Sequence, residues 1–166
     1  MTHGRKPRRY ARISANPVQL AIMRATRHTA EELASVMTPV RQCLKLVREG
    51  VATQLQFEVL QSTMLIAEAI EHSGIVRGLA DHIASALQAC SAIEARALTS
   101  GAWRQTALHF YELDALATAV DLHEYQLQQL SAGELHRIVQ QTMARTASTG
   151  GNVVRVSEND LALMAA

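Results

Sequence analysis

The sequence is poor in the residues that mark secreted or membrane-spanning proteins. Of its 166 residues only six are aromatic and two are cysteines, Cys43 and Cys90. No motif pairs these cysteines and no secretory signal precedes them, so we expect reduced, buried thiols. The apolar stretch at residues 18–23 is short and Arg24 ends it, whereas a membrane span needs about 18 apolar residues. These absences predict a cytoplasmic protein that does not cross a membrane.

Motifs for catalysis and metal binding are also missing. There is no Cys-x-x-Cys, no His-Glu-x-x-His, no nucleophile elbow and no glycine-rich phosphate loop. A di-iron bundle needs paired Glu-x-x-His motifs, and none of the seven histidines has a glutamate three residues before it. We interpret these histidines as surface or bundle-edge residues. The sequence therefore predicts no enzyme, no metal, no cofactor and no small-molecule substrate.

One stretch rich in titratable groups, residues 109–125, permits a catalytic hypothesis. His109 and Glu112 lie three residues apart and could be arranged as an acid–base pair, with Asp114 and Asp121 on one helix face nearby. The polar outer face of a bundle helix shows the same pattern. We prefer that second interpretation, because no other catalytic motif accompanies the stretch.

Helix-forming residues dominate what is present, since Ala, Leu, Ile, Val and Met supply most of the 48% hydrophobic content. Apolar residues recur at helical spacing between Gly- or Pro-containing breaks. The expected helices cover residues 17–28, 39–49, 53–72, 75–97, 104–130 and 131–147. Capping signals at Thr53 and Ser131 mark helix starts, and Gly50 and Gly74 mark helix ends. A further capping signal at Thr29 either restarts the first helix or continues it through a kink.

No segment of useful length alternates with the period of a β-strand. Amphipathic helices joined by short breaks must bury their apolar faces against one another. We therefore predict an all-α fold, an antiparallel bundle of about four main helices. The expected organisation is a flexible basic arm at 1–15, a bundle domain at 16–147 and a loose C-terminal tail at 148–166.

Charge is distributed unevenly along the chain. Residues 1–12 hold five Lys/Arg and no acid, whereas the remaining 154 residues hold 11 Lys/Arg and 15 Asp/Glu. A flexible basic segment with a tyrosine can follow a phosphate backbone and stack on a base. The predicted nucleic-acid-binding residues are Arg5, Lys6, Arg8, Arg9, Tyr10 and Arg12. The alternatives are a solvated tail, or an arm that docks on an acidic patch of a neighbouring subunit.

Two further patterns suggest binding surfaces. Residues 29–49 fit a helix-turn-helix, with Thr38-Pro39 as the turn and 40–49 as the recognition helix, although an ordinary break between bundle helices explains them equally well. Trp103 lies close in sequence to Phe110 and Tyr111. These aromatics form either an exposed contact patch or a plug at one end of the bundle.

Several segments carry a resemblance to known proteins. They are the basic opening that ends in Asn16-Pro17, and residues 46–53, 66–69, 112–116 and 122–127. Together they resemble an uncharacterised family of small helical proteins encoded in proteobacterial phages, prophages and mobile elements, over roughly residues 5–147. The resemblance implies a phage-like setting and an accessory or regulatory role. It carries over no catalytic or binding residue.

Two functional hypotheses follow from these patterns. The first is a non-enzymatic accessory or regulatory protein that contacts nucleic acid through its basic arm. The second is a helical module for protein–protein interaction that self-associates and has no nucleic-acid role.

Overall fold

The computed structural model describes residue 18, residues 21–22 and residues 25–150 of the chain. The helices that it places there are α2 (Ala30–Glu49), α3 (Gln54–Ser73), α4 (Ala80–Ala97), α5 (Phe110–Gln129) and α6 (Ala132–Ser148). These described residues contain no β-strand, only an isolated bridge between Arg27 and Ser131. The all-α prediction is confirmed for this part of the chain.

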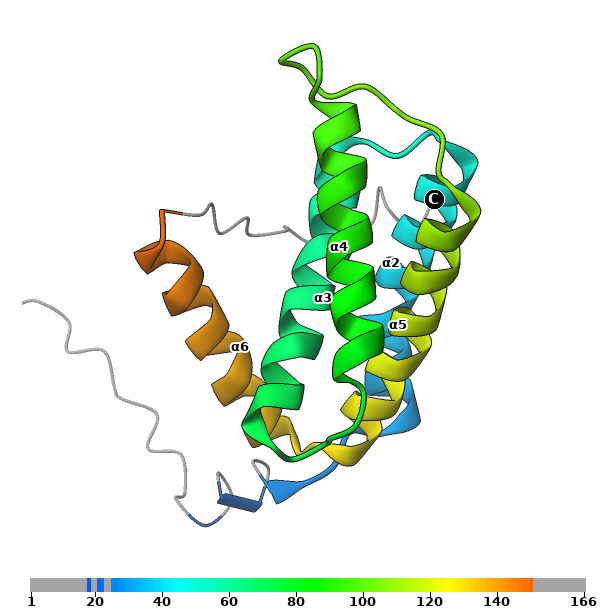
Figure 1. Ribbon diagram of the computed structural model, residues 1–166. Helices are drawn as coiled ribbons and strands as arrows, with labels where there is room; N and C mark the ends of the chain where they lie inside the picture. Colours follow the sequence, from blue (N-terminus) through cyan, green and yellow to red (C-terminus); the bar gives the residue numbers. More distant parts are fainter. Residues whose placement is uncertain (1–17, 19–20, 23–24, 151–166) are drawn as a thin grey trace, which may run out of the picture.

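Four of these helices form a closed bundle. Helix α2 packs against α3, α3 against α4 and α4 against α5, and α5 returns to contact α2 (Figure 1). Helices α3 and α5 also touch across the diagonal of the ring. Helix α6 packs chiefly on α3 and leans away from the other helices. The bundle thus begins with α2, and the last long helix is an addition to its side.

Most expected helix ends are confirmed. The side chains of Thr29 and Thr53 accept hydrogen bonds from the backbone N–H groups of Glu32 and Gln56, three residues later. The side chains of Glu32 and Gln56 in turn accept hydrogen bonds from the backbone N–H groups of Thr29 and Thr53. Gly50 ends α2 with a φ of 71°, in the left-handed region that favours glycine. These local signals are read correctly from sequence because each satisfies backbone groups that the helix itself leaves unpaired.

The core lies between the four bundle helices and is filled mainly by apolar side chains. Its largest fully buried members include Phe57, Leu60, Met64, Ile70, Ile83, Leu116 and Leu127. Both cysteine thiols are buried as expected. Burial raises the pKa of Cys43 to about 11 and that of Cys90 to about 12, so both thiols are protonated at neutral pH.

The helix-turn-helix hypothesis for residues 29–49 is wrong. Helix α2 runs without a turn from Ala30 to Glu49 and includes Pro39 in its interior. Thr38 does not cap a new helix, because its hydroxyl donates back to the carbonyl of Ala34 at 2.7 Å. Proline removes one backbone hydrogen bond, but Met37 and Val40 on either side are buried in the core. Packing outweighs the local break signal here, so no separate recognition helix exists.

Two other helix boundaries also differ from prediction. Helix α4 begins at Ala80 rather than 75, and α5 begins at Phe110 rather than 104. Leu79 at the start of α4 has no cap of its own; instead Glu71 of α3 accepts the N–H groups of Gly78 and Leu79 at 2.7 and 3.3 Å. Ile75 and Leu79 continue the apolar spacing of α4 at steps of four, which explains why periodicity placed the start of that helix too early.

The N-terminal side of the described chain is held at the end of the bundle where α5 passes into α6. The carbonyl of Thr26 accepts a hydrogen bond from Ala132 N–H at 3.0 Å, and Arg27 is bridged to Ser131. Figure 1 shows this segment below the bundle, at the end where α2 begins. Thr26 and Arg27 are therefore fixed at this end of the bundle.

Candidate functional site

The predicted nucleic-acid-binding residues Arg5, Lys6, Arg8, Arg9, Tyr10 and Arg12 lie outside the described residues. The titratable stretch of α5 and the aromatic group around Trp103 lie within them. The candidate site is therefore built from α4, α5 and the segment that joins these helices.

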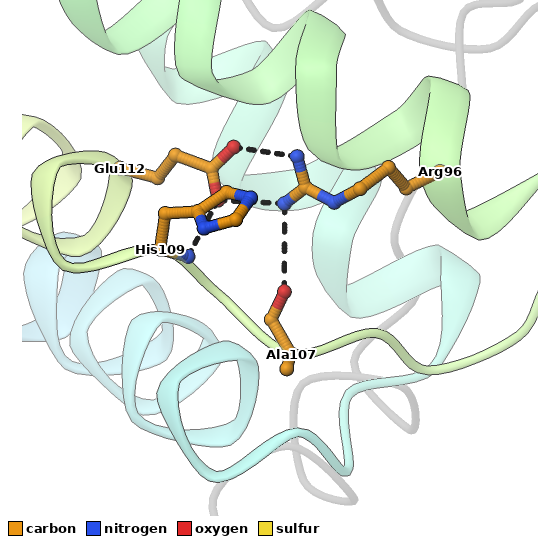
Figure 2. Close-up of polar contacts among 4 residues, drawn as sticks. All are labelled: Arg96, Ala107, His109 and Glu112. Atoms are coloured by element: carbon orange, nitrogen blue, oxygen red, sulfur yellow. Dashed lines mark hydrogen bonds and ion pairs between the residues drawn. The ribbon is translucent and has the colours of Figure 1, made fainter.

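The first polar group on α5 is the Arg96–Glu112 pair. Glu112 is completely buried, and its two carboxylate oxygens accept hydrogen bonds from the two terminal nitrogens of Arg96 at 2.7 and 2.6 Å (Figure 2). Arg96 also reaches the Ala107 carbonyl at 3.5 Å, and the backbone N–H of His109 donates to Glu112 at 2.8 Å. The pair ties the end of α4 to the start of α5 and to the intervening segment.

Electrostatics make this pair a charged one. Burial alone would raise the pKa of Glu112, but hydrogen bonds from Arg96 and from His109 N–H outweigh it and lower that pKa below its usual value. The hydrogen bonds to Glu112 likewise raise the pKa of Arg96. Both Glu112 oxygens are thus committed to structural partners.

His109 does not form the acid–base pair that the sequence allowed. Its backbone N–H contacts Glu112, while its exposed imidazole stacks on the ring of Tyr111 with 5.4 Å between centroids and 4° between planes. The carboxylate of Glu112 meets a guanidinium rather than an imidazole. This geometry favours a role for Glu112 in joining helices.

A second polar group lies in the C-terminal half of α5. His123 is 4% exposed, and its Nδ1 lies 3.3 Å from Oε1 of the fully buried Gln126. Gln126 in turn donates to the Ala67 carbonyl of α3 at 3.1 Å. Burial lowers the pKa of His123 to about 4, although the hydrogen bond to Gln126 opposes that shift. The imidazole is therefore neutral at physiological pH.

The outer-face interpretation of this stretch is wrong for Glu112 and His123. Together with Gln126 they continue the spacing of the core residues Leu116 and Ala119, so they share the buried face of α5. That shared spacing is the sequence signal that would have placed them inside. Asp114 and Asp121, in contrast, are exposed as the outer-face interpretation requires.

The aromatic residues divide between the two roles considered for them. Trp103 packs on Phe57 with 5.1 Å between ring centroids, and its indole N–H donates to the Ala52 carbonyl at 3.1 Å. It is a plug at the end of the bundle. Phe110 and Tyr111, in contrast, are 84% and 66% exposed at the start of α5.

The outward face of α5 carries a regular stripe of side chains. Tyr111, Asp114, Thr118, Asp121 and Tyr125 follow one another at steps of three and four residues, which places them on one side of the helix. Beside this stripe a groove of about 440 Å³ runs between α4 and α5. Its walls come from His82, Gln88 and Ala92 of α4 and from Tyr111, Asp114 and Thr118 of α5.

The basic residues of α2 lie on the other flank of α5. Arg41 forms an ion pair with Glu124 and lies 3.5 Å from Asp121. Lys45 and Arg48 follow on the same helix and are exposed. Since the recognition helix does not exist, we interpret this row as the polar face of a bundle helix.

Comparisons with known proteins provide no family for the chain. No family model, no curated protein and no solved structure matches it. Within the described part of the chain, no three His, Cys, Asp or Glu side chains come together as metal ligands. None of the described helices is long and apolar enough to cross a membrane. The resemblance to phage-encoded proteins stays a prediction.

Proposed function

We propose that the protein is a non-enzymatic, cytoplasmic accessory or regulatory protein of phage type that contacts nucleic acid through its basic N-terminal arm. The observation that carries the proposal is the separation of charge between arm and bundle. Residues 25–150 hold nine Lys/Arg and thirteen Asp/Glu, whereas residues 1–12 hold five Lys/Arg and no acid. An acidic bundle repels phosphates, so binding to nucleic acid must be concentrated in the arm.

The arm has the composition for such contacts. Its arginines and lysine neutralise phosphates, and Tyr10 offers a ring on which a base can stack. Five phosphate contacts predict a loss of roughly 100- to 500-fold in affinity between 50 and 200 mM salt, depending on whether the nucleic acid is single- or double-stranded.

Neutralising the arm tests the proposal. A variant with Arg5, Lys6, Arg8, Arg9 and Arg12 changed to Gln should lose this binding and its salt dependence, while its circular dichroism shows that the helices stay folded. The matched control changes Lys45 and Arg48 of α2 to Gln and should bind as the natural chain does. If the arm variant binds DNA and RNA oligonucleotides as tightly as the natural chain, the proposal fails.

The exposed aromatic pair favours a second candidate function, a helical module for protein–protein interaction that self-associates. Phe110 and Tyr111 present apolar rings to solvent beside a groove, and aromatic side chains of this kind often anchor protein interfaces. Changing both to Ser should then shift the sedimentation coefficient toward that of a monomer. A natural chain that sediments as a strict monomer at all concentrations removes self-association from consideration.

A further inference from the structure

Helices α4 and α5 form a face with almost no positive charge. Over their whole lengths they contain one Lys/Arg, Arg96, and that side chain is committed to Glu112. The same two helices carry six acids: Asp81, Glu94, Glu112, Asp114, Asp121 and Glu124. Glu112 is buried, and Arg41 of α2 contacts Asp121 and Glu124. Asp81 and Asp114 are exposed and form no ion pair with a basic side chain among the described residues, so a cationic segment can approach them without competition.

The groove between the two helices has the chemistry for such a segment. Asp114 lies on its wall, and Asp81 lies one residue from its end at His82. Among the described residues neither carboxylate has a hydrogen-bond or ion-pair partner. Tyr111 adds an exposed ring to the same wall. Unpaired carboxylates beside an aromatic face are the groups that a guanidinium binds by paired hydrogen bonds and by cation–π contact.

The chain itself contains a segment of matching chemistry, the arginine-rich residues 5–12. Thr26, which is anchored beside the end of α5, lies fourteen positions after Arg12. Fully extended, that connection spans about 45 Å, and even wholly helical it would rise about 21 Å. A 20-residue helix such as α5 is about 30 Å long. The arm can therefore reach the near end of the groove in either case.

We propose that, when no nucleic acid is bound, the N-terminal arm of each chain lies in the groove between its own α4 and α5, where its arginines contact Asp81, Asp114 and Tyr111. This inference rests on the proposed function. The carboxylates of Asp81 and Asp114 then bind the arginines that would otherwise bind phosphates, so nucleic acid must displace these carboxylates before it can bind the arm. The apparent affinity for nucleic acid falls by the fraction of chains whose arm is docked.

Spin labelling tests the docking without any nucleic acid. A nitroxide attached to Thr2→Cys is selective, since Cys43 and Cys90 are buried and protonated. At low salt it should broaden the amide signals of Asp114 and Thr118 and leave those of α6 unchanged. Mixing ¹⁵N-labelled natural chains with spin-labelled unlabelled chains should give no such broadening. Broadening in the mixture as well assigns the groove to the arm of a second copy, and no broadening in either sample removes the docking; both outcomes overturn the proposal.

Variants of the groove test its effect on binding. Asp81→Asn with Asp114→Asn should release the arm and strengthen oligonucleotide binding about two- to fivefold for each ion pair lost. The matched control, Glu49→Gln with Glu31→Gln, removes two exposed acids from α2 and should strengthen binding less, through net charge alone. Equal gains in the two variants overturn the competition. If the arm docks but the natural chain binds no nucleic acid, the proposed function fails while the groove assignment stands.

Discussion

Helix α5 buries polar side chains in both of its halves, and the two halves compensate for the loss of contact with water in different ways. Near its start, Glu112 is buried as an anion and is matched by a guanidinium from α4. In its second half, His123 is buried as a neutral base beside a neutral amide. The first group joins separate parts of the chain, whereas the second fills the bundle interior and reaches one carbonyl of α3.

The difference shows how the bundle tolerates polar groups inside it. A buried charge requires a partner with complementary hydrogen bonds, and the fork of Arg96 supplies two of them. A group that can lose its charge requires only a hydrogen bond, because burial shifts its pKa instead. The two sites should therefore respond differently to mutation, to pH and to salt.

The largest effect is expected when the charged pair is broken. Glu112→Ala leaves the Arg96 guanidinium without its partner and the N–H of His109 without an acceptor. Because the Arg96 side chain is about a third exposed, we expect a loss of about 3 kcal/mol, at the low end for a broken buried pair. Urea denaturation at pH 7 measures it.

The double variant Arg96→Met with Glu112→Leu is the control for that loss. It removes both charges together and should recover much of the stability, because no charge is left unpaired. If the double variant is as unstable as Glu112→Ala, then the loss reflects packing at the start of α5 rather than charge.

The burial of neutral His123 should make the free energy of unfolding depend on pH. The folded-state pKa of His123, about 4, lies below the usual value near 6.5, so protonation favours the unfolded chain. The neutral imidazole of His123 therefore makes its full contribution to the free energy of unfolding above pH 6.5, and that contribution is lost as pH falls toward 4. The shift corresponds to about 3 kcal/mol at the lower end of that range. Unfolding followed at pH 7, 6, 5 and 4.5 measures it.

His123→Leu should flatten the stability profile between pH 6.5 and 4.5. The charged pair titrates in a separate range: the lowered pKa of Glu112 keeps its contribution intact above the ordinary carboxyl value near 4.3, and loses it only as pH falls further. A steep loss above pH 5 that persists in His123→Leu would assign the effect to other groups.

A smaller effect is expected from the hydrogen bond that supports the imidazole. Gln126→Leu removes the hydrogen bonds to His123 and to the Ala67 carbonyl but fills the same space with an apolar side chain. We therefore expect the free energy of unfolding to fall by about 1 kcal/mol at pH 7. The pKa of His123 should fall further, because the hydrogen bond that Gln126 Oε1 accepts from the imidazole raises it. An NMR titration of the His123 ring signals measures the shift, and a rise in that pKa would contradict this account.

The same two halves of α5 show what sequence can and cannot predict. Capping signals at Thr29, Thr53 and Ser131 gave correct helix starts, because the partners of a cap lie within three residues. The partner of Glu112 lies 16 residues away on another helix, and that of Gln126 lies 59 residues away. Helical spacing could have placed these polar residues on the buried face of α5, but it contains no information on which distant group each of them would contact.

Tertiary packing also explains the wrong boundary at Pro39. A Thr-Pro pair favours a helix start in isolation, but the apolar face of α2 on both sides of it packs into one core. For the aromatic residues Phe110 and Tyr111, sequence alone left burial and exposure equally open. Their aromatic character suggested burial as readily as exposure, and only the docking of Trp103 on Phe57 decided which ring completes the core.

The smallest effect is expected from an ion pair on the surface, which completes the comparison. Arg41 contacts Glu124 and Asp121 of α5 across the seam with α2, but its side chain is about half exposed. Solvent and salt screen such a pair, so Arg41→Ala should cost less than 1 kcal/mol, and that cost should shrink further in 0.5 M NaCl. The buried pair should keep most of its effect in the same salt. A loss above 2 kcal/mol for Arg41→Ala, unchanged by salt, would contradict this account. It would show that burial does not decide how much each ion pair stabilises the fold, and that the contact between α2 and α5 depends on charge as much as the Arg96–Glu112 contact does.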